Sequence, residues 1–303
     1  MMMKVLITGA TGLIGKEIVK RCHKNNIDVN YLTTSKSKIE NTKNYQGFYW
    51  DTKNKEIDVN CFKEVDAIIH LAGATISKRW TPAYKEEIIN SRVESTQLLI
   101  DSLKGESHTI KHVIASSAIG IYPDSITHYY DETFKDFDDT FISDVVVKWE
   151  QSVDGFSKLD ILVSKVRTGL VLSEKGGALS EMVKPIKIGL GASFGTGEQW
   201  QSWIHLDDLT NMYLYILTNS LEGVYNGVAP NPVTNNELTK SIAKTLDKPL
   251  FLPQIPKFTM KLVLGEMHTL LFDSQRVSSK KIEEMGFNFK FSYLKPALED
   301  LLG

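Results

Sequence analysis

The sequence predicts an α/β fold, a doubly wound parallel sheet with a smaller substrate-side and C-terminal region. Short apolar runs of strand length alternate along the chain with longer stretches of helical periodicity. This alternation is typical of a parallel sheet with helices on both faces. The first apolar run passes directly into a glycine-rich turn, and 303 residues suffice for one large domain with a small addition.

The first element is a strand that leads through glycines into a helix. Val5 to Ile7 form an apolar run that suits a strand buried on both faces. Gly9, Gly12 and Gly15 follow it at even spacing. Apolar residues then recur at helical spacing, namely Ile14, Ile18, Val19 and Cys22. The order strand, turn and helix is therefore expected over the first part of the chain.

This turn suits the phosphates of a dinucleotide. The backbone N–H groups at the start of a helix point outward and carry partial positive charge. We expect Gly9 to permit the tight turn, Gly12 to let a pyrophosphate approach the backbone, and Gly15 to let helix and strand pack closely. Thr11, Leu13 and Ile14 complete the predicted cofactor loop. A plain strand-to-helix turn is the alternative, because glycines also serve ordinary turns.

Further strands and helices follow in alternation. Strands are predicted at 29–33, 67–72, 112–116 and 161–163 with 166–167. Thr81 and Pro82 suit the N-cap and the first position of a long helix. Ligands of open parallel sheets bind beyond the carboxyl ends of the strands. The segments that follow the strands are therefore candidate site residues, at 9–15, 33–36, 71–74 and 116–122.

The residue composition changes after residue 173. A glycine-punctuated, loop-rich stretch predicts an insertion at about 174–204 that closes over the pocket, within a dinucleotide-binding domain of 1–235. Proline-rich turns precede a small C-terminal domain expected at 248–297. We expect apolar residues 260–267 to pack onto the main domain around 189–203, because such a surface is unfavourable in water. A dimer interface is the alternative for this apolar segment.

The charge and cysteine content indicate which kinds of binding partner and cellular compartment to expect. The formal net charge is −2 with both signs interspersed, which favours neither a nucleic-acid nor a membrane partner. Cys22 and Cys61 form no motif and are expected to be reduced core residues. The early first strand leaves no room for a signal peptide and no apolar run is of membrane-spanning length, so a cytoplasmic protein is expected. No metal-ligand motif is present, and the oligomeric state is left open.

The end of the second strand bears on the choice of cofactor. An acidic residue at this point normally binds the ribose 2′-hydroxyl of NAD. Here the strand ends in Thr33, Thr34, Ser35 and Lys36, followed by Lys38, without an acid. Hydroxyls and lysines suit a 2′-phosphate, which favours NADP(H) over NAD(H). The alternative is a solvated polar loop.

The glycine spacing and several later motifs resemble a known family. The glycine pattern with Thr8 resembles the short-chain dehydrogenase/reductase superfamily, in particular its extended, epimerase-like branch. The whole set resembles the NAD-dependent epimerase/dehydratase-like family, in its atypical branch with a short C-terminal domain of unknown function. The stretches that carry this resemblance are 8–15, 70–73, 90–96, 147–150, 167–172, 176–178, 189–191, 202–208, 226–230 and 275–277.

The resemblance implies a Rossmann-type fold that binds NADP(H), with Leu71, Ala72 and Gly73 beside the adenosine and ribose. The substrate of this branch is generally unassigned. Some relatives carry a cell-division-inhibitor label. His70 precedes this turn, and a histidine in a strand is more often a core residue than a catalyst.

The superfamily's chemistry normally uses a Ser or Thr, a Tyr and a Lys four residues after the Tyr. Ser116 or Ser117 is available to position the substrate oxygen. The Tyr-x-x-x-Lys pair is absent, because either register of residues 141–146 gives Phe or Ile followed by Val. Tyr122 is the candidate replacement acid, and a packed aromatic residue is its alternative role.

Four further residues complete the expected site. Arg92 shares a helix face with Ile88 and is expected to meet either the cofactor or the carboxylates of Glu86 and Glu87. Arg167, Trp203 and His205 are predicted on the substrate side. The sequence therefore predicts an NADP(H)-binding, epimerase-like oxidoreductase that acts on an unknown small molecule. The alternative is a non-enzymatic dinucleotide-binding regulator, possibly linked to cell division.

Overall fold

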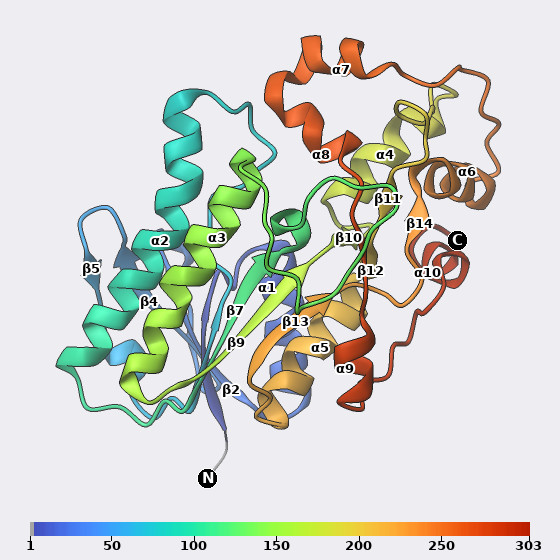
Figure 1. The fold of residues 1–303 in the computed structure, drawn as a ribbon. Coiled ribbons are helices and arrows are strands. Elements are labelled where there is room, and N and C mark those ends of the chain that lie inside the picture. Colours follow the sequence, from blue (N-terminus) through green and yellow to red (C-terminus); the bar gives the residue numbers. More distant parts are fainter. Residues whose placement is uncertain (1–2) are drawn as a thin grey trace.

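A nine-stranded sheet forms the centre of the computed structural model, which describes residues 3–303 (Figure 1). Its strand order is β13-β9-β7-β6-β1-β2-β4-β3, with β5 beside β4. All pairings from β13 to β4 are parallel, and only β3 and β5 run antiparallel to β4. The strands span Lys4–Thr8 (β1), Asp28–Thr33 (β2), Asn41–Thr42 (β3), Tyr45–Asp51 (β4), Glu56–Ile57 (β5), Ala67–His70 (β6), His112–Ala118 (β7), Leu162–Thr168 (β9) and Gly223–Gly227 (β13). The predicted doubly wound parallel sheet is confirmed.

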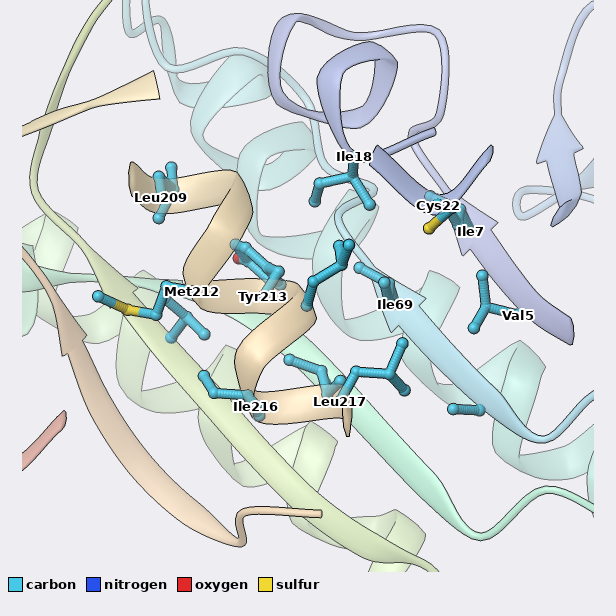
Figure 2. Close-up of a cluster of buried hydrophobic side chains, with 14 of the residues drawn as sticks. Val5, Ile7, Ile18, Cys22, Ile69, Leu209, Met212, Tyr213, Ile216 and Leu217 are labelled. Carbon is cyan, nitrogen blue, oxygen red and sulfur yellow. The ribbon is translucent and has the colours of Figure 1, made fainter. Parts of the chain in front are cut away.

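Helices cover both faces of this sheet. Helices α1 (Leu13–Lys24) and α5 (Leu206–Thr218) pack on one face, and α2 (Pro82–Gly105) and α3 (Phe141–Val153) pack on the other (Figure 1). Figure 2 shows the core on the first face, where Val5 and Ile7 of β1 lie near Ile18 of α1 and Leu217 of α5. Leu6 points to the opposite core, beneath α2 and α3. Burial on both faces explains why the strands read as continuous apolar runs.

The predicted elements are found within a few residues of their expected bounds. Strands β2, β6, β7 and β9 confirm the runs identified in the sequence. Helix α2 begins as expected, since Thr81 Oγ1 accepts a hydrogen bond from the Tyr84 amide at 3.2 Å and Pro82 takes the first position. Thr140 caps α3 in the same way, through the Ser143 amide at 3.3 Å. Cys22 and Cys61 are buried free thiols, as predicted.

Strand β4 was not predicted from the sequence. Its residues Tyr45–Asp51 are aromatic and polar instead of aliphatic, and Gly47 interrupts them. The glycine is needed because a Cβ there would lie 2.5 Å from the Tyr31 hydroxyl oxygen. The ring of Tyr31 also stacks on that of Tyr45, with centroids 4.3 Å apart. Aromatic packing at the sheet margin therefore stabilises a strand that an aliphatic pattern would not reveal.

The region after β9 forms a second packed unit beside the sheet. The predicted loop-rich insertion also contains one helix that was not predicted, α4 (Ala178–Lys187). Gly177, with φ of +78°, turns the chain into this helix, whose apolar face is buried. Trp203 lies fully buried in the core that α4 shares with later helices. The other elements here are β10 (Leu170–Leu172), β11 (Trp200–Gln201), β12 (Trp203–His205), β14 (Val233–Thr234), α6 (Asn235–Thr245) and α10 (Leu294–Leu302). Helix α9 (Lys280–Glu284) instead packs on β13, with Ile282 in the core of the sheet.

The chain after residue 250 packs onto the region 189–203, as expected. The amide of Ile255 donates to the carbonyl of Ser193 at 2.8 Å, and short segments α8 (Thr269–Phe272) and β15 (Arg276–Val277) follow. Strand β15 pairs with β8 (Tyr129–Tyr130). Helix α7 (Lys257–Leu264) differs from the expectation, because none of its residues is buried and Leu262 is 84% exposed.

Burial of the whole apolar stretch 260–267 was therefore predicted wrongly. Helix α7 stands at the outer edge of the fold and contacts mainly the turn that follows it (Figure 1). Only the end of the stretch reaches a core, where Met267 is buried with Ile88 of α2 and Val145 of α3 and Leu264 packs against this cluster. No helix within residues 3–303 is both long and apolar enough to cross a membrane.

Candidate functional site

The glycine turn has the geometry of an anion site. Gly9 has φ of +71°, which favours glycine, and its carbonyl accepts a hydrogen bond from the Gly12 amide at 3.0 Å. A Cβ at Gly15 would lie only 2.2 Å from the Gly9 carbonyl oxygen, so the helix can approach the strand only with glycine there. Gly12 is the N-cap of α1, and no side chain caps the amides of the first turn. These amides are available to an anion.

A cavity of about 870 Å³ begins at this turn and extends past the end of β2. It lies at the carboxyl ends of β1, β2 and β6, where ligands of open parallel sheets bind. The structure brings together seven predicted cofactor residues in its wall, namely Gly9, Thr11, Thr33, Thr34, Ser35, Ala72 and Gly73. Gly12, Leu13, Ile14 and Gly15 form the start of the adjoining helix. Leu71 immediately precedes the lining residue Ala72.

The lysines near the end of β2 differ in their positions. Lys36 does not line the cavity, and its ammonium nitrogen lies 4.8 Å from the centre of the Tyr49 ring. Lys38 and Lys53 do line the cavity. Lys53 belongs to the hairpin after β4, and sequence reasoning missed it because β4 itself was not predicted. Asp51 of the same hairpin accepts hydrogen bonds from the amides of Lys53 and Asn54, at 3.0 and 3.2 Å.

Helix α2 gives the cavity an acidic wall. Glu86, Glu87 and Glu94 all line it, together with Asn90 and Ser91. Sequence reasoning considered the first two glutamates only as partners of Arg92. The cavity therefore has carboxylates on the α2 side, and on the β2 and β4 side it has the ammonium groups of Lys38 and Lys53 beside the carboxylate of Asp51.

Arg92 contacts neither Glu86 nor Glu87 in this structure. Its Nη1 donates to the carbonyl of Ile88 at 2.8 Å, and its guanidinium lies over the Trp149 ring at 4.9 Å from the centroid. A Cβ at Gly73 would lie 3.1 Å from the guanidinium carbon, so Arg92 lies directly beside the cavity wall. Burial lowers the pKa of Arg92 to about 10, which leaves it charged at neutral pH. Its contact with a cofactor stays a prediction.

His70 fixes the turn that follows β6. The Thr96 hydroxyl donates to the Arg92 carbonyl, so its oxygen can accept from His70 Nε2, 3.1 Å away. His70 Nδ1 then accepts from the Thr8 hydroxyl at 2.8 Å, and that oxygen accepts from the Leu71 amide. Burial lowers the pKa of His70 to about 4. The ring is therefore neutral and serves a structural role in this turn.

A buried hydrogen-bond chain joins three of the predicted substrate-side and catalytic residues. Ser117 Oγ donates to Glu150 Oε1 at 2.6 Å, and Arg167 donates to both oxygens of that carboxylate at 2.8 and 2.9 Å. Arg167 Nη1 also donates to the Tyr122 hydroxyl at 3.0 Å, and this hydroxyl donates to Asn226 Oδ1 at 2.8 Å. The three predicted residues thus lie together. Their polar groups already form hydrogen bonds with one another or with Glu150 and Asn226.

Burial and hydrogen bonding shift the pKa values of Glu150 and Tyr122 in this network. Burial alone would raise the pKa of Glu150, but the hydrogen bonds and charge of Arg167, with the Ser117 hydroxyl, lower it below its usual value. Burial raises the pKa of Tyr122 to about 12, although Arg167 opposes that shift. Glu150 was missed as a site residue. Its position on the core-facing side of α3, among Val146, Trp149 and Val153, is the sequence signal for a buried charge.

Ser116 differs from its neighbour in the same strand. It is half-buried, whereas Ser117 is 2% exposed. Successive residues of a strand point to opposite faces, so Ser116 is directed toward the α1 and α5 side. Of the two predicted serines, Ser116 is the one with exposed surface at the carboxyl edge of the sheet.

The place of the absent Tyr-x-x-x-Lys pair is apolar. Ile142 packs on Gly120, where a Cβ would lie 2.4 Å from the Ile142 Cγ2 atom. Val145 and Val146 are both 3% exposed and belong to separate apolar clusters. Helix α3 therefore presents hydrocarbon over residues 142–146, where the sequence analysis expected the pair.

Trp203 and His205 are buried inside the second unit. Trp203 Nε1 donates to the carbonyl of Asn231 at 2.9 Å. His205 Nδ1 accepts from the Asp207 amide at 3.0 Å and so caps α5, while its Nε2 lies 3.3 Å from Asp300. Burial lowers the pKa of His205 even though these acids oppose the shift. Their predicted role on the substrate side stays a prediction.

Two segments of the chain match known family models. Residues 5–139 match the NAD dependent epimerase/dehydratase family, and residues 255–301 match a domain of unknown function, DUF1731. An epimerase family protein of Staphylococcus aureus (strain MRSA252) is 38% identical over 302 residues, which is 99% of both chains. An epimerase family protein of Staphylococcus haemolyticus is 36% identical over 306 residues, again 99% of both chains.

Solved structures show the same fold over the whole chain. The crystal structure of a human epimerase family protein with NADPH superposes with a TM-score of 0.85 at 28% identity, over 99% of both chains. A nucleoside-diphosphate sugar epimerase of Corynebacterium glutamicum superposes with a TM-score of 0.80 at 27% identity, over 100% of this chain and 59% of that one. A UDP-N-acetylglucosamine 4-epimerase of Bacillus cereus, at 18% identity and a TM-score of 0.77, shares the fold.

Proposed function

The chain belongs to the NAD dependent epimerase/dehydratase family, and on this premise we propose that it is an NADP(H)-binding, epimerase-like oxidoreductase acting on a small molecule. The observation that carries the proposal is the cavity of about 870 Å³ that joins the uncapped start of α1 to the hydroxyl-rich end of β2. The amides at the start of α1 suit the pyrophosphate. Gly9 and Gly15 fit this role, since side chains there would disturb the turn.

The choice of NADP(H) over NAD(H) rests on the far end of that cavity. Thr33, Thr34 and Ser35 offer hydroxyls, and Lys38 and Lys53 offer positive charge, without an acid at the end of β2. A 2′-phosphate is well matched to such a set. The NADPH in the human family member's structure, at 28% identity, supports the same choice.

The reaction centre is proposed at the carboxyl edge of β7. When bound, NADP(H) supplies hydride transfer. Ser116, half-buried at this edge, would position the substrate oxygen, and Ser117 is the alternative. Tyr122 is the proposed proton donor and would have to release Asn226 to act. Ile142 and Val146 exclude water from the side where the usual acid would stand.

Titration calorimetry with NADPH and NADH tests this proposal. We expect NADPH to bind more tightly, because only its 2′-phosphate can meet Lys38 and Lys53. The double variant Lys38→Gln/Lys53→Gln should weaken NADPH binding by about tenfold and leave NADH binding unchanged. Lys36→Gln is the matched control, since this lysine lies over Tyr49 and outside the cavity. A clear preference for NADH would overturn the choice of cofactor.

A non-enzymatic regulator that binds the dinucleotide is the second candidate. The apolar surface of α3 at Ile142, Val145 and Val146 favours it, because acid catalysis needs a polar donor there. A screen of small carbonyl compounds for NADPH oxidation distinguishes the two. Turnover that depends on Ser116 supports the enzyme, and tight NADPH binding without turnover by any compound supports the regulator. We also propose that residues 1–235 and 248–297 are the two domains of the chain.

A further inference from the structure

Arg276 carries a positive charge that no group of the described chain neutralises. It lies on β15, in the C-terminal segment that matches the domain of unknown function. Its guanidinium carbon lies 4.4 Å from the ring centroid of Trp200 and 5.0 Å from that of Tyr129. Its Nε is buried and has no hydrogen-bond partner within residues 3–303. No carboxylate of these residues forms an ion pair with it, and the two aromatic rings face its charge instead.

Other arginines of the described chain find hydrogen-bond acceptors; even Arg92, which also lies over an aromatic ring without a carboxylate partner, donates to the carbonyl of Ile88 at 2.8 Å. Arg167 is held by both oxygens of Glu150, and Arg21 pairs with Asp207 at 2.7 Å. A guanidinium has five N–H donors in one plane, and a buried donor without an acceptor is unfavourable. Aromatic rings stabilise the charge through its faces and leave the edge of the plane without acceptors. Because Nε is buried, an oxyanion with two oxygen atoms would meet the two terminal nitrogens of this plane.

The rings and the backbone around Arg276 are fixed in place. Trp200 Nε1 donates to the carbonyl of Ile126 at 3.0 Å, which sets the orientation of the indole. The amide of Val277 donates to Ser202 Oγ at 2.9 Å, and that hydroxyl donates to the carbonyl of Gln275 at 2.8 Å. The site is therefore built before a ligand arrives, which reduces the entropy lost on binding.

Arg276 also lies on the side of the molecule where a substrate is expected. The side chain of Gln275, its neighbour, donates to the carbonyl of Tyr122 at 2.7 Å. Tyr122 follows the carboxyl end of β7, and ligands of open parallel sheets bind beyond such ends. Arg276 does not line the cofactor cavity. The free charge is therefore separate from the nucleotide and joined to the loop that carries the candidate acid.

We propose that Arg276, held between Trp200 and Tyr129, binds a carboxylate or phosphate group of the substrate. This inference rests on the proposed function, because it assigns a chemical class to the small molecule of that same site. It gives the C-terminal segment a role in recognition, since β15 brings the guanidinium to a strand that lies far away in the sequence. Neutral carbonyl compounds without an acidic group would not use this contact.

Anion binding to the full chain tests the inference. Inorganic phosphate and succinate serve as probes, measured by calorimetry and by tryptophan emission, which Trp200 makes sensitive to a ligand at Arg276. We expect both anions to bind, and Arg276→Gln to weaken the binding by about 10- to 100-fold. Arg276→Lys should retain part of the affinity, because it keeps the charge without the planar fork. Arg79→Gln, at an exposed arginine, is the matched control and should bind as the unaltered protein does.

The outcomes separate this inference from the proposed function. NADPH binding, followed by nicotinamide fluorescence, should be unchanged in Arg276→Gln. If NADPH binds but neither anion does at millimolar concentration, the inference is overturned and the proposed function stands. If Arg276→Gln lowers only the melting temperature and leaves anion affinity unchanged, Arg276 is a structural support and the inference is again overturned. If Arg276→Gln does not fold, Arg276→Lys decides, since weaker anion binding at an unchanged melting temperature supports the inference.

Discussion

Arg167 and Glu150 form a two-pronged ion pair under the carboxyl ends of the central strands, with N–O distances of 2.8 and 2.9 Å. Both side chains are almost fully buried. Removal of one member leaves the other charged in a medium that solvates it poorly. We predict that Glu150→Gln lowers the free energy of unfolding by about 3–5 kcal/mol in urea titrations.

The exposed pair Asp144–Lys148 on the same helix is the control. Its N–O distance is 2.7 Å, but both side chains face water. Asp144→Asn should therefore change the free energy of unfolding by less than about 1 kcal/mol. Because the pKa of Glu150 is lowered in the folded state, its contribution is present above the unfolded pKa and is lost as the pH falls through the folded value. If both variants lower the free energy of unfolding equally, the buried pair stabilises the fold no more than the exposed pair does.

Gly12→Val should abolish binding of either nucleotide. Gly12 is the N-cap of α1, and a branched side chain there would occupy the space in front of the free amides. The fold should survive, since a Cβ at this position would lie 3.3 Å from its nearest neighbour, in contrast to 2.2 Å at Gly15. Gly105→Ala, where a Cβ meets no atom within 4 Å, controls for loss of a glycine. A folded Gly12→Val protein with unchanged NADPH affinity would falsify the assignment of the turn.

His70 should make the protein sensitive to mild acid. Its folded pKa of about 4 lies below the ordinary value of 6.5, so the folded state resists protonation of this ring. Stability is then complete above pH 6.5 and falls as the pH decreases toward 4, with an upper figure of about 3 kcal/mol. Buried His112, whose pKa burial also lowers to about 4, adds to the same slope.

Urea unfolding at several pH values checks this slope. His70→Gln should make it shallower between pH 6.5 and 4, because the neutral amide has no proton to gain, while His112 keeps its own part of the slope. His128→Gln is the control, since this histidine is exposed. A slope in His70→Gln equal to that of the unaltered protein would contradict the prediction.

Tyr122→Phe should lower turnover strongly and the free energy of unfolding only modestly. If Tyr122 donates the proton, its loss should lower turnover of a substrate by about 10² to 10⁴. Loss of the hydrogen bonds to Asn226 and Arg167 should lower stability by about 1 kcal/mol as well. Tyr130→Phe, on the ring that stacks on Tyr122 at 5.1 Å, is the matched control for aromatic packing. Steady-state kinetics and urea unfolding measure the two effects.

The two serines complete that test. Ser116→Ala should lower turnover with little change in stability, whereas Ser117→Ala leaves Glu150 short of a buried donor and should lower stability by about 1–3 kcal/mol. A substrate whose turnover is unaffected by Tyr122→Phe, Ser116→Ala and Ser117→Ala would remove all three residues from the reaction.

The sequence predicted the sheet and the glycine turn because both depend on local patterns. Val5 to Ile7 are buried by the helices on either face. Gly9 is favoured by its own positive φ, and Gly15 is required by its contact with the backbone of Gly9. These signals are visible without knowledge of the rest of the chain. Strand β4 was missed because its stabilisation comes from Tyr31, in another strand.

The polar contacts of the site depend on distant partners. Nothing near Arg167 in the sequence indicates that Glu150 binds it, and nothing near Arg276 indicates Trp200 and Tyr129. Helix α7 shows the opposite error. Its apolar residues suggested burial, but at the edge of the fold it contacts mainly the turn that follows it, and none of its residues is buried.

All residues that line the cofactor cavity lie between positions 9 and 95. Strand β15 (Arg276–Val277), in contrast, pairs with β8 (Tyr129–Tyr130), which lies far before it in the sequence. Proteins are made from the N-terminus, and early segments can fold while the ribosome still holds the rest. The nucleotide site can therefore assemble first, and the anion site only after release of the finished chain. A nonsense mutation before residue 276 would therefore remove the anion site and leave every residue of the cavity wall in the chain.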